Sequence, residues 1–223
     1  MNQHLQGASP PCAAGVEGLN IVKLGGSLGG GPAPTAWLDA VLAGPGAAVI
    51  VPGGGPFADQ VRSLQSLWDF SDSAAHHLAL IAMEQVGYAL AALRPGALVP
   101  AADATAIRDC LRNGLVPVWL PTAMVLARPE IPHSWAVTSD SLALWLGRCL
   151  GAVRVVLVKS AKPPSGPVSP TALMADGLVD EAFADFITSD GPEAWCLGPG
   201  DCAALSSLLC GEAKTGTRIL PDG

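Results

Sequence analysis

Charged and aromatic residues are scarce in this chain of 223 residues. Only 14% of the residues are charged and 5% are aromatic, whereas 50% are hydrophobic. The 12 Lys and Arg residues against 19 Asp and Glu residues leave a net charge of −7, which argues against nucleic acid as the main partner. A small anion remains compatible with this balance, because a pocket needs only a few backbone donors and one or two cations to hold it.

The 6 cysteines do not occur in the paired C-x-x-C spacing of a zinc site, nor at the density of a disulfide-stapled small domain. We therefore expect reduced thiols in a cytoplasmic protein. The histidines lack the i, i+4 spacing with a nearby carboxylate that is typical of metal-binding helices, so we expect no metal held by protein side chains.

No apolar run is long enough to span a bilayer. The most apolar stretch, residues 115–127, is about 13 residues long and is interrupted by Pro117 and Pro121. The first 20 residues contain no basic segment followed by a continuous apolar one, so we expect no signal peptide and no membrane contact. We interpret residues 1–18 as a flexible tail and residues 19–223 as a single domain.

Strand and helix patterns alternate along the rest of the chain, as short β-branched runs and as apolar residues at helical spacing. The predicted strands are residues 19–24, 47–51, 98–100, 116–120, 153–158, 194–197 and 216–220. The predicted helices are residues 35–42, 57–67, 73–93, 104–113, 138–150, 171–175, 179–186 and 201–209. The alternation predicts an α/β fold, a three-layer αβα sandwich with a mostly parallel central sheet. Ligands of such sheets bind beyond the carboxyl ends of the strands.

A lysine stands near the end of the first predicted strand, directly before a glycine-rich turn. Lys23 is followed by Leu24, Gly25, Gly26 and Ser27. Glycine amides approach an anion closely because no Cβ obstructs them, and an ammonium neutralises developing charge, so the combination suits a transferring phosphoryl group. A plain tight turn beside a solvated lysine is the alternative, although a lysine at the end of a buried strand is unusual.

A second glycine loop follows the next predicted strand. Gly53, Gly54 and Gly55 precede a predicted helix, where backbone amides and the helix dipole favour an anion. Two such loops predict two phosphate-bearing ligands. The second loop, through Ala58, also matches the dinucleotide fingerprint G-x-G-x-x-G/A, but a long helix follows where that fingerprint requires a strand ending in an acidic residue. A dinucleotide oxidoreductase is therefore not favoured, and the sequence contains no Walker A loop.

Three further residues stand where function is expected. Asp140 begins a predicted helix, so its carboxylate suits either capping of that helix or pairing with a catalytic lysine, and both interpretations stay open. Lys159 follows the most β-branched strand and therefore falls at the edge of the sheet where ligands bind. Trp135 is suited to form one wall of a binding site for an aromatic ligand. A position in the hydrophobic core is the alternative.

Three motifs, in this order, resemble those of the amino acid kinase superfamily: Lys23-x-Gly25-Gly26-Ser27, Val51-Pro52-Gly53-Gly54-Gly55 and Thr138-Ser139-Asp140. The superfamily includes kinases of acetylglutamate, aspartate, uridylate and isopentenyl phosphate. The sequence resembles in particular the methanofuran-pathway kinases that convert [5-(aminomethyl)furan-3-yl]methyl phosphate to its diphosphate in one-carbon metabolism. Four further segments carry that likeness: residues 55–62, 73–76, 133–142 and 179–183.

The resemblance implies the amino acid kinase fold, with an N-terminal lobe for the acceptor and a C-terminal lobe for the nucleotide. It implies ATP as phosphoryl donor, with Mg²⁺ carried by ATP, and a homo-oligomer, either a dimer or larger. Lys23 and Asp140 are the implied catalytic residues, the first stabilising the transferred phosphoryl group and the second orienting the lysine. The residues implied to contact the ATP phosphates are Lys23, Gly25, Gly26 and Ser27. The residues assigned to the acceptor, a small phosphorylated metabolite, are Gly53, Gly54, Gly55, His133, Trp135 and Ser139.

The sequence departs from the superfamily pattern after the strand predicted at residues 153–158. An Asp-x-x-Gly-hydrophobic nucleotide loop is usual there, and this chain has Lys159-Ser160-Ala161-Lys162-Pro163-Pro164 instead. We assign Lys159, Ser160 and Lys162 of this altered loop to ATP binding. Two alternative functions stay open: a non-catalytic anion- or nucleotide-binding or storage protein on the same fold, and a kinase for an amino acid, UMP or isopentenyl phosphate.

Overall fold

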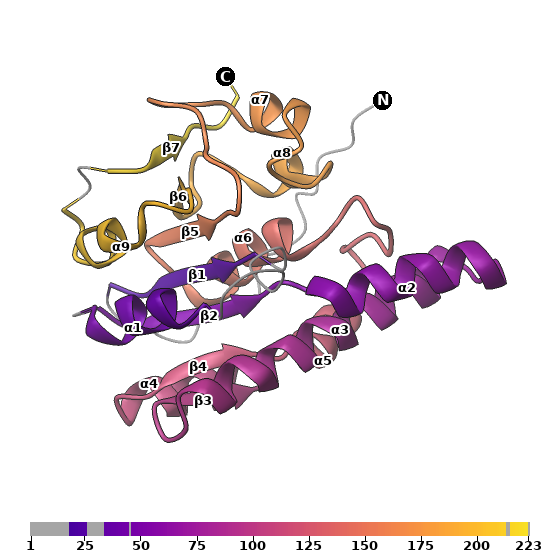
Figure 1. The fold of residues 1–223 in the computed structure, drawn as a ribbon, viewed down its shortest axis with the longest axis horizontal. Helices are drawn as coiled ribbons and strands as arrows, with labels where there is room; N and C mark the ends of the chain where they lie inside the picture. The colour runs from indigo at the N-terminus through magenta and orange to yellow at the C-terminus, as the bar shows by residue number, and fades with distance from the viewer. Residues whose placement is uncertain (1–17, 26–33, 45, 213–214, 223) are drawn as a thin grey trace.

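The structure is a computed structural model that describes residues 18–25, 34–44, 46–212 and 215–222 (Figure 1). The tail expected over residues 1–18 therefore lies outside the described residues, apart from Gly18. Gly26 and Ser27 of the first glycine loop also lie outside them, and the roles expected for these two residues stay predictions from the sequence.

Within the described residues the strands form a seven-stranded sheet. The strands are β1 (Asn20–Leu24), β2 (Ala48–Pro52), β3 (Leu98–Ala101), β4 (Val116–Trp119), β5 (Arg154–Val158), β6 (Glu193–Leu197) and β7 (Thr217–Ile219). Their order is β3-β4-β2-β1-β5-β6-β7, and every neighbouring pair is parallel except β6 and β7. In Figure 1 β1 and β2 lie at the centre, between β5 on one side and β4 on the other. The predicted α/β fold with a mostly parallel sheet is confirmed.

Helices connect most of the strands, near their predicted positions. They are α1 (Thr35–Ala43), α2 (Gly55–Trp68), α3 (Asp72–Leu93), α4 (Ala104–Arg112), α5 (Thr122–Leu126), α6 (Ser139–Leu150), α7 (Pro170–Ala175), α8 (Phe183–Phe186) and α9 (Cys202–Leu209). Helix α5 has no counterpart in the sequence prediction, because five residues are too few to show a helical period. The helix predicted over residues 179–186 is limited to α8. Tertiary hydrogen bonds hold the residues before it, since Ala182 N–H donates to Ala136 O.

The central strands are covered on both faces. All residues of β1, β2 and β5 are buried, as is typical of parallel strands between two layers of helices. Ile21 and Val49 contribute to one hydrophobic core, which also contains Leu142 and Leu146 of α6. Alternate strand residues point the other way and form a second core with α1 and α9. The molecule is thus a three-layer αβα sandwich.

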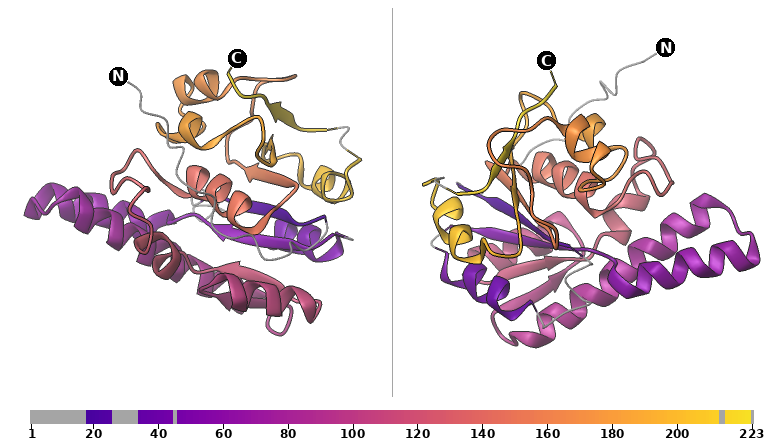
Figure 2. Two further views of the ribbon diagram at one scale, coloured as in Figure 1. Left: turned by 180° about the vertical axis from the view of Figure 1, so that it is seen from behind. Right: turned by 45° about the horizontal axis from the view of Figure 1, so that its top comes forward.

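Helices α2 and α3 form a hairpin that projects beyond the sheet, as both views of Figure 2 show. Asp69 ends α2 in the left-handed conformation with φ of 53°, and the Ser71 hydroxyl caps α3 by accepting from Ala74 N–H. Helix α2 begins at Gly55, the last residue of the second glycine loop. The base of the hairpin therefore lies at the carboxyl edge of the sheet, where the candidate site residues gather.

Candidate active site

Three charged side chains that are far apart in the sequence meet at the carboxyl edge of the sheet. The Lys23 ammonium lies 2.8 Å from Asp140 Oδ1, and the Lys159 ammonium donates a 2.6 Å hydrogen bond to Asp140 Oδ2. All three residues are buried, with exposed fractions of 5%, 5% and 8% for Lys23, Asp140 and Lys159. We call them the lysine–aspartate cluster. It carries a surplus of one positive charge within a chain of net charge −7.

Sheet register explains why the two lysines share one carboxylate. Strands β1 and β5 are parallel neighbours, and Lys23 pairs with Leu157. Because side chains two residues apart point to the same face, Lys159 projects on the same face as Lys23, toward α6. Asp140 stands in the first turn of α6, which packs on that face. Lysine pairing is therefore the observed role of this carboxylate.

Burial and neighbouring charges shift the pKa values of Asp140 and Lys159. Burial alone would raise the pKa of Asp140, but the charges and hydrogen bonds of Lys23 and Lys159 outweigh it, so this pKa is lowered. Burial and the charge of Lys23 lower the pKa of Lys159, although Asp140 acts against them. Asp140 is thus an ionised carboxylate engaged by ammonium groups on both of its oxygens, which suits it to hold lysines and not to accept a proton.

The start of α6 is capped by a carboxylate from a distant segment. Asp180 Oδ2 accepts from Thr138 N–H at 2.9 Å, from the Thr138 hydroxyl at 2.8 Å and from Ser141 N–H at 3.1 Å. Its Oδ1 accepts from the Ser141 hydroxyl. Burial, followed by the charge of Asp140, raises the pKa of Asp180, while these hydrogen bonds act in the opposite direction. Asp180 thereby fixes the turn that carries Asp140, a role that sequence analysis did not predict.

A cavity of about 540 Å³, which we call the lysine cavity, opens beside the cluster. Lys23, Asp140 and Lys159 form its charged end. Met174, Leu178 and Val179 give it an apolar side, and its other lining residues are Arg62, Trp135, Ala136, Thr138, Ser160, Ala161, Gly177, Asp180 and Glu181. A cationic end and an apolar side are the features that a nucleoside triphosphate requires for its phosphates and its base.

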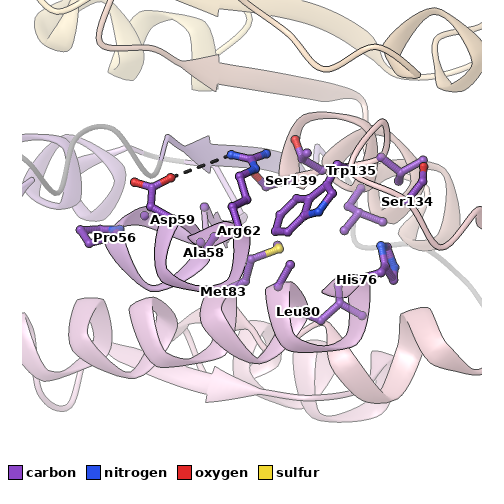
Figure 3. A pocket seen from close by; sticks show the side chains of 17 residues that line it. Pro56, Ala58, Asp59, Arg62, His76, Leu80, Met83, Ser134, Trp135 and Ser139 are labelled. Atoms are coloured by element: carbon purple, nitrogen blue, oxygen red, sulfur yellow. Dashed lines mark ion pairs between the residues drawn. The ribbon is translucent and has the colours of Figure 1, made fainter. Parts of the chain in front are cut away.

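A second cavity, of about 340 Å³, lies under the second glycine loop, and we call it the glycine-loop cavity (Figure 3). The loop residues Gly53, Gly54 and Gly55 line it, together with the α2 residues Pro56, Ala58, Asp59 and Arg62. Helix α3 contributes His76, Ala79, Leu80 and Met83, and the segment before and into α6 contributes Ser134, Trp135, Val137, Thr138, Ser139 and Leu142. The two cavities share Arg62, Trp135 and Thr138, and are therefore adjacent.

The second glycine loop has the backbone geometry of an anion-binding nest. Gly54 is right-handed, with φ of −74°, and Gly55 is left-handed, with φ of 53°. Successive residues of opposite hand turn their N–H groups to one side, here at the N-terminus of α2. The Gly53 N–H is already donated to Leu24 O at 2.9 Å, so Gly54 and Gly55 are left to supply the donors.

Arg62 and Trp135 stand where the two cavities meet. The Arg62 guanidinium lies 4.2 Å from the centre of the Trp135 ring, and Trp135 Nε1 donates a 2.7 Å hydrogen bond to Gln65 Oε1. Arg62 also lies 3.9 Å from Asp59, one helical turn away (Figure 3). A cation at this junction is suited to an anionic group that passes between the cavities.

The remaining predicted residues have different placements. Ser139 and Trp135 line the glycine-loop cavity, whereas His133 does not line it but stacks on His76, with ring centres 4.9 Å apart. Gly25 is buried, and its N–H donates to Val158 O at 3.2 Å. Ser160 lines the lysine cavity. Lys162 is exposed and is absent from the linings of both cavities described above.

Two sequence expectations of absence can be compared with the described ranges. Among those residues no group of three or more His, Cys, Asp or Glu side chains is arranged to hold a metal ion. In the same part of the chain, no helix combines the length and the apolar character needed to cross a membrane.

Comparisons with known proteins show the family through sequence and the fold through structure. Residues 18–162 match the amino acid kinase family. A [5-(aminomethyl)furan-3-yl]methyl phosphate kinase from Methanocaldococcus jannaschii is 32% identical over 214 residues, which cover 91% of this chain and 98% of that protein. The structure of uridylate kinase from Archaeoglobus fulgidus matches with a TM-score of 0.67 at 17% identity, covering 90% of this chain and 99% of that one. UMP kinase from Ureaplasma parvum matches with a TM-score of 0.62 at 12% identity, covering 90% and 97%.

Proposed function

The chain belongs to the amino acid kinase family of phosphotransferases, and from that premise we propose that it transfers the γ-phosphoryl group of ATP to a small metabolite that already carries a phosphate. The observation that carries the proposal is the buried lysine–aspartate cluster beside two adjoining cavities. ATP is assigned to the lysine cavity and the acceptor to the glycine-loop cavity. Their shared lining at Arg62 and Trp135 is where donor and acceptor phosphates meet.

The state of Asp140 favours a phosphate as the nucleophile. Its two oxygens face ammonium groups and its pKa is lowered, so it is not available as a general base. A phosphate acceptor needs no base, because its oxygens are already ionised at neutral pH. One of these oxygens attacks the γ-phosphorus, the bond from that phosphorus to the β–γ bridging oxygen breaks, and ADP leaves while the acceptor becomes a diphosphate.

The cluster supplies the electrostatic part of catalysis. Lys23 and Lys159 are desolvated ammonium groups held in place before ATP binds, so they stabilise the charge that develops on the transferring oxygens without reorganising. Asp140 lies between them as their shared counter-charge. Its single negative charge leaves the lysine–aspartate cluster with one formal positive charge, which suits an anionic substrate group.

Magnesium belongs to the proposal as an ion carried by ATP. When bound, it supplies neutralisation of charge on the triphosphate. The described side chains fit an ion that arrives on the phosphates, because Asp140 is taken up by the two lysines. Asp180 is likewise taken up, since it caps α6.

The acceptor that we propose is [5-(aminomethyl)furan-3-yl]methyl phosphate. This compound is the substrate in the name of the relative that is 32% identical. The glycine-loop cavity offers donors for the phosphate at Gly54 and Gly55 and a flat aromatic wall at Trp135. Leu80 and Met83 complete an apolar middle section of a size that suits a furan ring. The proposal includes a place in methanofuran biosynthesis and a cytoplasmic location.

Turnover of a panel of acceptors tests this function. The purified protein is incubated with ATP and Mg²⁺ and with the furan phosphate, isopentenyl phosphate, UMP, acetylglutamate or aspartate, and product and ADP are measured. We expect efficient diphosphate formation from the furan phosphate. Efficient use of another acceptor alone would overturn the substrate assignment. ATP binding by calorimetry without turnover of any acceptor would favour the non-catalytic binding protein.

A homo-oligomer is also part of the proposal. Large apolar side chains are exposed along the projecting hairpin of α2 and α3: Phe57, Leu67, Trp68, Leu78, Ile81 and Tyr88. Exposed apolar side chains on a projecting hairpin suit a contact between copies of the chain. Light scattering should give the mass of a dimer or a larger assembly, and the pair of changes Ile81→Glu and Tyr88→Glu should reduce it to that of a monomer.

A further inference from the structure

His76 lines the glycine-loop cavity, and one nitrogen atom of its ring is buried without a partner among the described residues. The residue is 4% exposed, and its Nε2 makes no hydrogen bond to any residue that the structure describes. A buried polar atom without a hydrogen-bond partner destabilises the folded protein. An unpartnered atom on a residue that lines a ligand cavity therefore points to a ligand group that completes it.

The groups around His76 indicate whether Nε2 is available as a hydrogen-bond donor or as an acceptor. The imidazole donates a hydrogen bond to the Ser134 backbone, and because Nε2 is unpartnered the donor is Nδ1. Burial and the nearby His133 and His77 lower the pKa of His76, which favours the neutral ring. A neutral imidazole protonated on Nδ1 presents a lone pair on Nε2. His76, a residue that lines the cavity, thus carries an unpaired hydrogen-bond acceptor at Nε2.

The ring of His76 is also held in a fixed orientation. It stacks on His133 with ring centres 4.9 Å apart and planes 9° from parallel, and His133 Nδ1 lies 2.9 Å from the Ser73 hydroxyl. In Figure 3 His76 lies at one end of the lining residues and Pro56, next to the glycine nest, at the other. The glycine nest and His76 therefore lie toward opposite ends of the cavity, and the lining residues between them include Leu80 and Met83.

We propose that His76 Nε2 is a recognition site for an amino group that the acceptor carries at the end opposite its phosphate. The inference rests on the proposed function and names a second group on the acceptor that the same cavity selects. An alkylammonium is a strong donor with no acceptor atom, so it pairs with a neutral imidazole nitrogen. A methyl group in its place leaves Nε2 unsatisfied.

A pair of ligands and a set of variants test the proposal. The ligands are [5-(aminomethyl)furan-3-yl]methyl phosphate and its counterpart with methyl in place of aminomethyl. For the wild type, kcat/KM in turnover and Kd in calorimetry should favour the amine by about tenfold or more. His76→Phe keeps a stacked ring but removes the acceptor atom, so the preference should fall to about twofold or less. His76→Gln restores an acceptor oxygen and should recover part of the preference.

Matched controls separate recognition from folding. His77→Phe changes the exposed neighbour on the same helix and should leave the preference at the wild-type value. The KM for ATP should stay within about twofold in every variant, because His76 is not in the lining of the lysine cavity. A His76→Phe protein that keeps the tenfold preference for the amine would overturn the proposal.

The same experiment distinguishes failure of the inference from failure of the proposed function. Turnover of both furan phosphates at equal efficiency by the wild type overturns the His76 proposal and leaves the kinase in place. Absence of turnover with any phosphate overturns the proposed function, and the calorimetric arm then decides the inference alone. Binding of the amine in preference to the methyl compound supports it, and equal binding or no binding of the two overturns it.

Discussion

The Lys159 ammonium and the Asp140 carboxylate form a buried, hydrogen-bonded ion pair 2.6 Å long. The same carboxylate holds Lys23 on its other oxygen. A single negative charge thus separates two desolvated positive charges, so removing any one of the three has a different consequence for stability and for activity. The effects of removing each charge, and the geometry of the second glycine loop, lead to four testable predictions.

The first prediction concerns the transferred phosphoryl group. Lys23→Met keeps the apolar stem but removes the ammonium, so kcat should fall by about 10²-fold or more, since one lost transition-state contact commonly has this effect. The melting temperature should change little, because Asp140 keeps Lys159 as a partner. Steady-state kinetics and thermal unfolding check both parts. Arg112→Met, on the exposed face of α4, is the control and should match wild type in kcat.

The second prediction contrasts Asp140→Asn with Lys159→Met in chemical denaturation. Asp140→Asn leaves two buried ammonium groups without a counter-charge, and the free energy of unfolding should fall by about 3–5 kcal/mol. Lys159→Met removes a desolvated charge and its repulsion with Lys23, so the free energy of unfolding should stay within about 1 kcal/mol of wild type. Both variants should lose phosphoryl transfer. Equal destabilisation by the two substitutions would contradict the arrangement of charges described here.

The third prediction is the pH dependence that Asp140 gives to stability. Its pKa in the folded protein is lowered below the ordinary value of 3.8, so the unfolded chain binds the proton more tightly. The stabilisation is therefore fully present above the ordinary value and is lost as the pH falls through the lowered one. Denaturation of wild type and Asp140→Asn at a series of pH values should give a difference that is constant near neutrality and shrinks in acid. A difference that grows in acid would contradict the direction of the pKa shift.

The sequence was sufficient for the layers of the fold and for parts of the site. The places of the second glycine loop, Lys23, Asp140 and Lys159 at the edge of the sheet could be predicted because each is a local signal, a polar residue or a turn at the end of a buried strand or the start of a helix. The order of strands in the sheet is not local. The neighbouring positions of β1 and β5, which bring Lys159 to the same carboxylate as Lys23, could therefore be seen only in the structure.

Other site residues were missed because a helical pattern hides them. Arg62 and His76 occupy ordinary positions on amphipathic helices, and their place in a cavity depends on segments more than 50 residues away. Asp180 was assigned to a helix, whereas it lies in a loop and caps α6. Conversely, Lys162 has the charge expected of a nucleotide ligand but is exposed beside buried Pro163. Residue type alone does not distinguish these cases.

The last prediction tests the glycine nest with two substitutions of the same kind. A Cβ at Gly54 would lie 2.5 Å from the Cβ of Ala58, closer than two non-bonded carbon atoms approach each other. Gly54→Ala should therefore displace the first turn of α2. The amides of the nest should then no longer donate hydrogen bonds to the acceptor phosphate. KM for the acceptor should rise by about tenfold or more, and KM for ATP should stay near the wild-type value. Gly200→Ala is the matched control, because no described atom lies within 4 Å of a Cβ placed there and the φ of Gly200 is not left-handed. It should leave both KM values unchanged. Equal effects of the two alanines on the acceptor would show that the nest does not hold its phosphate.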